Sequence, residues 1–177
     1  DEEDVRTIPG CHFENETKAA ADWLGRVSLI GGTAWCFCRP ELAGRIDTLF
    51  VDEASQVSLA KVVAMSRAAK NIVLVGDQMQ LSQPTRAAHP GRSGLSALDS
   101  MLDGDTTIAP ERGLFLATTY RLHPRICSFV SGAFYEDRLE PAPANADRRV
   151  EGIEPGLHFV RVAHEGNTQG SDEEARA

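Results

Sequence analysis

The 177-residue sequence lacks an uninterrupted apolar run of about 18 residues or more, the length that would indicate a membrane span. It also lacks an excess of positive charge, because 18 Lys and Arg residues face 26 Asp and Glu residues and leave a formal net charge of −8. These shortages predict a soluble, cytoplasmic protein with no membrane partner. They also argue against a binder of polyanions that works by bulk attraction, although a local basic groove can exist on an acidic protein.

Cysteine is sparse and forms no metal-binding pattern. Cys36 and Cys38 make one Cys-x-Cys pair without a second close pair, and Cys11 and Cys127 stand far from it. The five histidines are scattered in the same way. We therefore expect free thiols in a reducing compartment, and we assign no metal site to cysteine or histidine.

Short apolar runs alternate with helical segments in the first part of the chain. Residues 48–51 (TLFV) and 72–75 (IVLV) are continuous apolar runs, which are typical of strands covered on both faces of a parallel sheet. The alanine-rich segment 57–70 between them has helical length, and residues 27–35 (VSLIGGTAW) form a further β-prone segment. This order predicts a βαβ unit and an α/β fold with a mainly parallel sheet.

The rest of the chain continues the alternation. We expect a helix at about 93–102, an extended segment at 114–120, a helix within 123–135, a loop at 140–156 and a strand at 157–163. The first helix places Leu95, Leu98, Met101 and Leu102 on one stripe. Apolar residues at i, i+3, i+4, i+7 and i+8 predict one buried face on the second helix, made by Ile126, Phe129, Val130, Ala133 and Phe134. Ser171 followed by Glu174 has the form of a capping box, which predicts the start of a helix that the sequence does not complete.

Polar residues follow both of the predicted central strands. Asp52 and Glu53 come directly after TLFV, at the carboxyl end of the strand, where the ligands of parallel sheets bind. Two adjacent carboxylates are costly to bury unpaired. A divalent cation resolves that conflict, because one carboxylate holds the ion while the next polarises an attacking water. The structural alternative is that the pair favours the N-terminus of the next helix, and the dipeptide alone favours that alternative.

The second predicted strand is also followed by polar residues, and this repetition favours a functional site over helix capping. Gly76 and Asp77 follow IVLV, and Gln80 offers both a donor and an acceptor to a phosphate or a water. Gly-Asp is by itself a common turn. Two successive strand ends that present polar residues at one edge of a sheet nevertheless predict a functional site.

Three segments together resemble a known family. Residues 52–56 (DEASQ), 76–81 (GDQMQL) and 120–124 (YRLHP) resemble motifs II, III and IV of superfamily 1 helicases, in particular those of the 5′-to-3′ class. Gly32-Thr33-Ala34 resembles motif Ic of the same family. More narrowly, GGTAW, HPGRSGLSALDSML, RGLFLATTYR and HEGN resemble the helicase portion of bacterial proteins in which a RecB-like nuclease module precedes the motor.

The resemblance implies a RecA-like P-loop NTPase fold with ATP bound between two domains. Residues 1–112 would form the C-terminal half of the first domain, with motifs Ic, II and III. Residues 113–177 would form the start of the second domain, with motif IV. Asp52 would coordinate Mg²⁺, and Glu53 would act as the general base for the hydrolytic water.

The same resemblance implies roles for residues further along the chain. Gln80 would sense the γ-phosphate, Asp77 would lie with the bound nucleotide, and Tyr120 would lie close to the adenine. Arg121 would reach the phosphates as an arginine finger. The alternatives are a surface ion pair for Arg121, ordinary packing for Tyr120 and helix entry for His123-Pro124.

The implied partner is single-stranded nucleic acid, DNA in preference to RNA. The rest of the protein's own helicase core and, from the narrower likeness, a fused RecB-like nuclease module are further implied partners. Thr33 of motif Ic would lie near the nucleic-acid backbone. Arg86 and Arg92, with Thr85, are candidates for the same contact in the loop after motif III. Simple solvation is the alternative for that loop.

The largest departure from the family is the missing phosphate-binding loop. That loop has the form Gly-x-x-x-x-Gly-Lys-Ser/Thr, and none of Lys18, Lys61 and Lys70 follows a glycine. We expect the loop upstream of Asp1, so that the chain is a fragment and does not hydrolyse ATP alone.

Two other classes of protein remain as alternatives. One is a non-catalytic RecA-like module that binds nucleic acid or protein without turnover. The intact Asp52-Glu53 pair and Arg121 argue against it, because such a module has little reason to keep them. The other is a different P-loop NTPase, which would share Asp-Glu after a strand but would not predict YRLHP at this distance.

Overall fold

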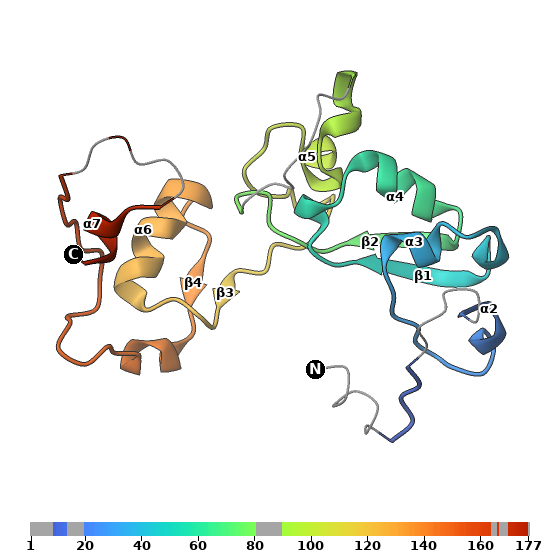
Figure 1. Cartoon of the computed structure of the whole chain (residues 1–177), viewed down its shortest axis with the longest axis horizontal. Coiled ribbons are helices and arrows are strands. Elements are labelled where there is room, and N and C mark those ends of the chain that lie inside the picture. The colour runs from blue at the N-terminus through green and yellow to red at the C-terminus, as the bar shows by residue number, and fades with distance from the viewer. Residues whose placement is uncertain (1–8, 14–19, 81–89, 164–165, 167–169, 177) are drawn as a thin grey trace. The chain divides into compact units, whose positions relative to one another are not determined.

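The computed structural model describes residues 9–13, 20–80, 90–163, 166 and 170–176 (Figure 1). The chain divides into two compact units, Asp1–Asp105 and Thr106–Ala177. The domain boundary expected near residue 112 stays a prediction.

The first unit is built around two parallel strands. Strand β1 (Ile46–Val51) pairs with β2 (Ala69–Leu74), and the register places Leu49 opposite Ile72 and Val51 opposite Leu74. Helix α4 (Leu59–Ser66) connects the strands and lies along one face of the sheet (Figure 1). The predicted βαβ unit and the α/β class are therefore confirmed.

Alternation along the strands decides which residues enter the core. Leu49 and Val51 are buried, and they pack in one cluster with Val62 and Met65 of α4. Phe50 points the other way and is 64% exposed. Among the described residues, the face that carries Phe50 is less covered than the face that carries Leu49 and Val51, so coverage of both faces stays a prediction.

Helix α4 begins where its sequence provides a cap. The Ser58 hydroxyl accepts a hydrogen bond from the Lys61 amide at 3.4 Å. The helix ends at Ser66, and β2 takes up residues 69 and 70, which the sequence pattern had given to the helix. An exposed salt bridge links the N-terminal ends of β1 and β2, since the Lys70 ammonium lies 2.8 Å from an Asp47 carboxylate oxygen. This contact lowers the pKa of Asp47 and raises that of Lys70.

The described part of the first unit also contains 3-10 turns at Pro40–Leu42, Ala54–Gln56 and Gly91–Gly94, and three short α-helices. They are α2 (Ala20–Trp23), α3 (Ala34–Phe37) and α5 (Ala97–Leu102). The strand predicted over residues 27–35 was wrong, because residues 28–33 form no strand and Ala34 already begins α3. An extended segment becomes a strand only when a neighbour supplies hydrogen bonds, and no described strand pairs with residues 28–33.

Helix α5 is shorter than the sequence predicted. It follows a 3-10 turn at Gly91–Gly94 and is capped by the Ser96 hydroxyl, which accepts from the Asp99 amide at 3.0 Å. Of the predicted stripe, Leu102 is buried and Leu98 packs against the core, whereas Leu95 and Met101 are exposed. Leu95 lies before the helix begins, so it does not share the helical face.

The second unit contains a longer helix beside a minimal parallel pair. Strand β3 (Thr118–Thr119) pairs with β4 (Glu140–Pro141), and α6 (Pro124–Phe134) connects them. His123 caps α6 through Nδ1, which accepts from the Arg125 amide at 3.2 Å, and Pro124 takes the first helical position. The predicted helix and its entry are confirmed, while β3 is only the end of the predicted extended segment.

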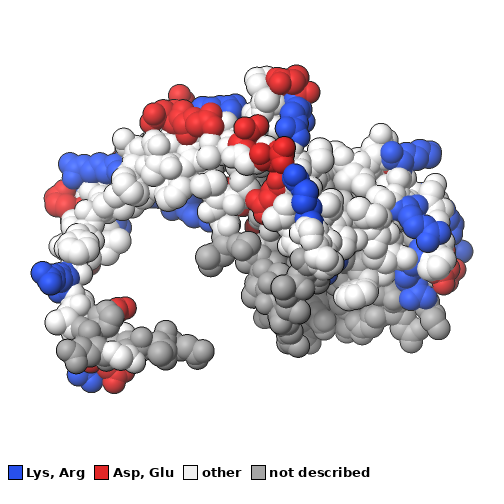
Figure 2. All heavy atoms as spheres, turned by 90° about the horizontal axis from the view of Figure 1, so that it is seen from above, with Lys and Arg blue, Asp and Glu red and all other residues white. Residues whose placement is uncertain are grey.

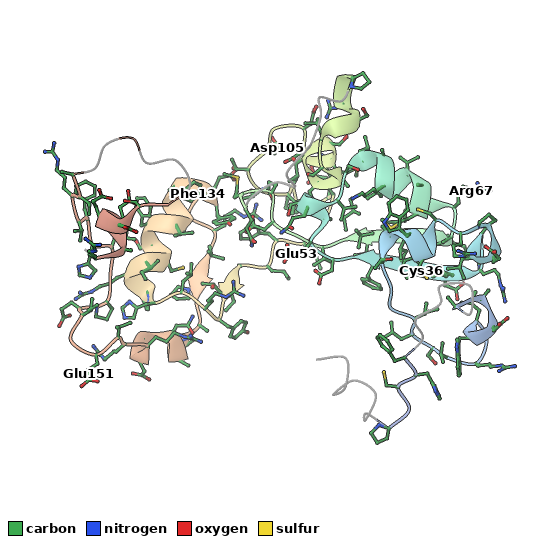
Figure 3. All side chains as sticks on the ribbon, in the orientation of Figure 1. Cys36, Glu53, Arg67, Asp105, Phe134 and Glu151 are labelled. Carbon is green, nitrogen blue, oxygen red and sulfur yellow. The ribbon has the colours of Figure 1, made fainter. Side chains whose placement is uncertain are left out.

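The buried face of α6 differs from the predicted one. Cys127 and Ser131 are buried, whereas Phe129 is 55% exposed and Phe134, labelled in Figure 3, is 41% exposed. The backbone that leads into β4 covers the helix along the Cys127–Ser131 line, since the Leu139 amide donates to the Ser131 hydroxyl at 2.9 Å. The apolar periodicity predicted that one stripe of the helix is buried. The neighbouring stripe, which contains Cys127 and Ser131, is the buried one, because the backbone before β4 contacts it.

The end of α6 holds the segment that opens the second unit. The Glu136 carboxylate accepts hydrogen bonds from the hydroxyls of Thr106 and Thr107, the latter at 3.0 Å. The Arg138 guanidinium donates to the Thr107 hydroxyl at 2.6 Å and lies 4.5 Å from the centre of the Phe115 ring. The two threonine hydroxyls hold the pKa of Glu136 below its usual range.

The C-terminal part of the unit has little regular structure. The strand predicted over residues 157–163 was wrong, because these residues form no strand and Phe159 is 92% exposed. The predicted loop 140–156 contains β4 and a 3-10 helix at Pro143–Asp147. Helix α7 (Asp172–Ala175) begins after Ser171, whose hydroxyl accepts from the Glu174 amide at 3.2 Å, which confirms the predicted start.

Two properties of the described chain concern its environment. The four cysteines are free thiols, and burial raises the pKa of Cys36 and Cys127. Within the described ranges, every helix is too short or too polar to cross a bilayer.

Candidate active site

The carboxyl ends of β1 and β2 are joined beyond the last residues of the strands. The Val75 amide donates to the Val51 carbonyl at 2.9 Å, and the Ala54 amide donates to the Val75 carbonyl at 2.9 Å. The chain then passes Gly76, where a Cβ would lie 2.8 Å from the Ala54 nitrogen. Only glycine permits this approach, so the structure brings the DEASQ and GDQMQ segments together at one edge of the sheet.

Asp52 and Glu53 lie exposed at this edge, and Figure 3 labels Glu53 where the ribbon leaves β1. An Asp52 carboxylate oxygen accepts from the Glu53 amide at 3.0 Å. Glu53 adopts a left-handed backbone conformation, with φ of 50° and ψ of 43°. Such a conformation costs a non-glycine residue roughly 1 kcal/mol or more and is enriched at functional sites.

The capping alternative for these two carboxylates has no support in the hydrogen bonds. Ser58, not Asp52 or Glu53, caps α4. Glu53 precedes a short 3-10 turn at Ala54–Gln56, and its side chain makes no capping hydrogen bond there. Both carboxylates are thus left facing solvent at the strand end.

Asp77 and Gln80 form a small hydrogen-bonded turn after β2. One Asp77 carboxylate oxygen accepts from the Met79 amide at 3.0 Å, and the other accepts from the Gln80 side-chain amide at 3.1 Å. The Gln80 backbone amide also donates to the Asp77 carbonyl at 3.3 Å. Asp77 therefore acts on the position of Gln80, a relation that the sequence did not reveal.

Ser55 is a polar residue of this edge that sequence reasoning passed over. It is 3% exposed, and among the described residues its hydroxyl has no hydrogen-bond partner. Buried hydroxyls are nearly always bonded, so this oxygen is an unmet donor and acceptor beside the two strand ends. Its only sequence signal is a small polar residue two positions after Glu53.

The donor set at this edge suits a hard cation that is shared with a phosphate. Carboxylate and amide oxygens of Asp52, Glu53 and Gln80 are the ligands that Mg²⁺ prefers. Among the described residues no group of three or more His, Cys, Asp or Glu side chains could by itself enclose a metal ion. Mg²⁺ usually binds through one or two carboxylates, waters and substrate phosphates, so the arrangement fits that mode and not a protein-only cage.

The predicted residues of the second unit lie on the turn between β3 and α6. Tyr120 is 74% exposed, and Arg121 is also exposed. The Thr119 hydroxyl accepts from the amides of Arg121 and Leu122 at 3.3 and 3.4 Å, which closes the turn. The side chains of Tyr120 and Arg121 therefore project from a turn whose backbone is hydrogen-bonded within the second unit.

The predicted nucleic-acid contacts have different environments. Thr33 is exposed at the start of α3 and borders a cavity of about 900 Å³ that Trp23 and Gly31 also line. The Arg92 guanidinium is engaged within its own unit, 2.8 Å from an Asp103 carboxylate oxygen and 3.2 Å from the Ser100 carbonyl. Arg86 lies outside the described residues, as does Thr85.

Charge on the surface is mixed. On the face seen in Figure 2, both acidic and basic side chains are present, and several basic side chains gather at the right-hand end of the view with few acidic ones among them. Any attraction to nucleic acid on this face is thus local.

Comparison with known proteins finds a family model that matches the first part of the chain. Residues 4–86 match the family model described as AAA domain. The chain is 27% identical over 147 residues to regulator of nonsense transcripts 1 of Caenorhabditis elegans, which covers 80% of this chain. It is 28% identical over 151 residues, or 85% of its length, to DNA polymerase alpha-associated DNA helicase A of Schizosaccharomyces pombe. It is 29% identical over 102 residues, or 57% of its length, to ATP-dependent helicase upf1 of the same yeast.

These relatives are much longer than the chain. The matched regions span 12%, 22% and 11% of their respective lengths. Two of these relatives are named as helicases, in agreement with the resemblance seen in the three motifs. The match to an AAA domain agrees with the α/β fold.

Proposed function

We propose that the chain is part of an ATP-dependent superfamily 1 helicase or translocase, which couples ATP hydrolysis to movement on single-stranded nucleic acid. The observation that carries the proposal is the close approach of Gly76 to Ala54, which brings the segment that follows β1 beside the segment that follows β2. The names of the relatives, among them an ATP-dependent helicase and a DNA helicase, support the same reaction class.

In this proposal the first unit supplies the hydrolytic groups. Asp52 would hold Mg²⁺, which when bound neutralises charge on the phosphates. Glu53 would take the proton of the attacking water, and its exposure at the strand end leaves the carboxylate free to do so. Gln80 would hydrogen-bond the γ-phosphate, with Asp77 holding its side-chain amide in place.

The second unit would supply charge and a stacking surface. Arg121 would donate to the γ-phosphate as charge develops there, and Tyr120 would lie against the adenine. Both side chains are exposed, as these roles require. The proposed domains are residues 1–112 and 113–177, each continued by the rest of the helicase core.

Single-stranded DNA is the proposed nucleic-acid substrate, and the cytoplasm is the proposed location. Thr33 and Arg86 are proposed to contact the strand backbone, and Arg92 would do so after releasing Asp103. The mixed surface charge supports contacts at a few positions and not attraction over a whole face.

Two finer features rest on motif likeness alone. The segments GGTAW and HPGRSGLSALDSML support a motor preceded by a RecB-like nuclease module. YRLHP supports 5′-to-3′ movement. A nuclease assay and a strand-displacement assay with tails of either polarity, both on the full-length parent, would test them.

The proposal is tested by ATP hydrolysis of the full-length parent with and without single strands. We expect hydrolysis that single-stranded DNA stimulates more than single-stranded RNA, and loss of it in Asp52→Asn. Stimulation by single-stranded RNA alone would show that RNA, and not DNA, is the nucleic-acid substrate. A parent that binds single strands but hydrolyses no ATP would instead be a non-catalytic module.

A further inference from the structure

A buried amide lies directly beneath the Tyr120-Arg121 turn. Asn145, in the 3-10 helix after β4, is 3% exposed. Its side-chain nitrogen donates to the Thr119 carbonyl at 2.8 Å and to the Leu122 carbonyl at 3.0 Å. These two carbonyls flank Tyr120 and Arg121 on both sides, so one side chain spans the turn.

Arg148 completes this support. Its Nη2 donates to the Tyr120 carbonyl at 2.9 Å, and its Nε donates to the Asn145 side-chain oxygen at 3.3 Å. Each polar atom of the Asn145 side chain is thereby bonded. The pairing of β3 with β4 brings the loop and the turn together, since Thr119 lies opposite Pro141 (Figure 1).

A buried polar network whose members are all bonded rigidifies the backbone that it contacts. Without the Asn145 side chain the Leu122 carbonyl would lose its Asn145 donor, whereas the Thr119 carbonyl would keep the Ala142 backbone amide at 2.9 Å. Leaving a polar group of the turn without its partner is unfavourable, so the bonded arrangement is preferred. Arg121 itself is exposed on a long flexible side chain, and the position of its guanidinium therefore depends on where the turn holds its Cα. A displacement of about 1 Å in a catalytic group costs roughly a hundredfold in rate.

We propose that Asn145 and Arg148 are positioning residues for Arg121 and Tyr120. The inference rests on the proposed function, because it assigns the 3-10 helix Pro143–Asp147 and the following Arg148 the task of presenting the arginine finger. Neither residue touches the nucleotide in this account. Both act through the carbonyls of Thr119, Tyr120 and Leu122.

The test uses two readouts on the full-length parent. Asn145→Ala should raise hydrogen exchange of the amides in residues 118–122 and lower the kcat of strand-stimulated ATP hydrolysis by about 10- to 100-fold. Arg148→Ala, a change at an exposed side chain, should act in the same direction and guards against failure of Asn145→Ala to fold. Asn71→Ala is the matched control, because Asn71 also donates its amide to a backbone carbonyl but lies in β2.

A double-mutant cycle separates positioning from general damage. In an Arg121→Ala background, Asn145→Ala should cost almost nothing further in kcat, since the positioned group is gone. The same fold loss in both backgrounds, or unchanged exchange in residues 118–122, would overturn the inference. Faster exchange together with an Arg121→Ala rate equal to wild type would instead refute the finger role on which the inference rests.

Discussion

Gly76 and Ala54 touch so closely that a methyl group on the glycine would lie 2.8 Å from the Ala54 nitrogen. It would also lie 2.9 Å from the Leu98 side chain. The contact joins the residues that follow β1 to those that follow β2. The geometry of the candidate site therefore depends on a residue that has no side chain.

Substitution of Gly76 should lower the stability of the protein. Gly76→Ala should lower the free energy of unfolding by about 1–3 kcal/mol, because the backbone around Ala54 must shift to admit the methyl group. Denaturant unfolding of the full-length parent measures this loss. The matched control is Gly31→Ala, where the new methyl group meets no heavy atom within 4 Å. Equal midpoints for the two variants would show that the strand ends are not packed as described.

Removal of the proposed finger should affect catalysis alone. Arg121→Ala should lower strand-stimulated ATP hydrolysis by about a thousandfold or more, because the charge that develops on the γ-phosphate loses its donor. Steady-state kinetics with saturating single strands gives the rate. Arg149→Ala, which removes another exposed arginine of the same unit, should leave the rate near that of wild type. A loss of similar size in both variants would point to charge in general and not to a finger.

The Glu136 carboxylate should make the second unit sensitive to acid. Its pKa is lowered in the folded state, so its contribution to stability is present above the ordinary glutamate pKa. That contribution is lost as the pH falls from about 4.3 through the lower folded value. Glu136→Gln should therefore destabilise the protein most near neutral pH, with a difference that shrinks in acid.

Urea unfolding at a series of pH values measures this difference. Glu151→Gln, which removes an exposed carboxyl of the same unit, serves as the control. A wild-type advantage over Glu136→Gln that persisted unchanged in acid would mean that the charged carboxylate is not what Thr106 and Thr107 bind.

Elements whose determinants are local could be predicted from the sequence. Strands β1 and β2 follow from short apolar runs, and α6 follows from a capping His123 with Pro124 after it. The strands expected at 27–35 and 157–163 did not form, because a strand needs a partner that the same segment cannot supply. Phe129 of α6 carries the predicted period but is exposed, since the contact partner of the helix decides which stripe is buried.

The site was predictable only in outline. Strand-end logic placed Asp52 and Gln80 at one edge, and the hydrogen bonds between the strand exits agree with it. The bond from Gln80 to Asp77 could not be inferred, because Gly-Asp also forms ordinary turns. Asn145 was hidden for a different reason: a polar residue in a proline-rich loop normally indicates solvation, and burial depends on a turn more than twenty residues earlier.

The most direct test of the central claim is Glu53→Gln in the full-length parent, measured as ATP binding and ATP hydrolysis on the same preparation. The substitution keeps the size of the side chain but removes the carboxylate that would take the proton of the attacking water. We expect ATP affinity near that of wild type and hydrolysis reduced by about 100-fold or more. Hydrolysis within a few fold of wild type would contradict the assignment of this strand edge as the catalytic site.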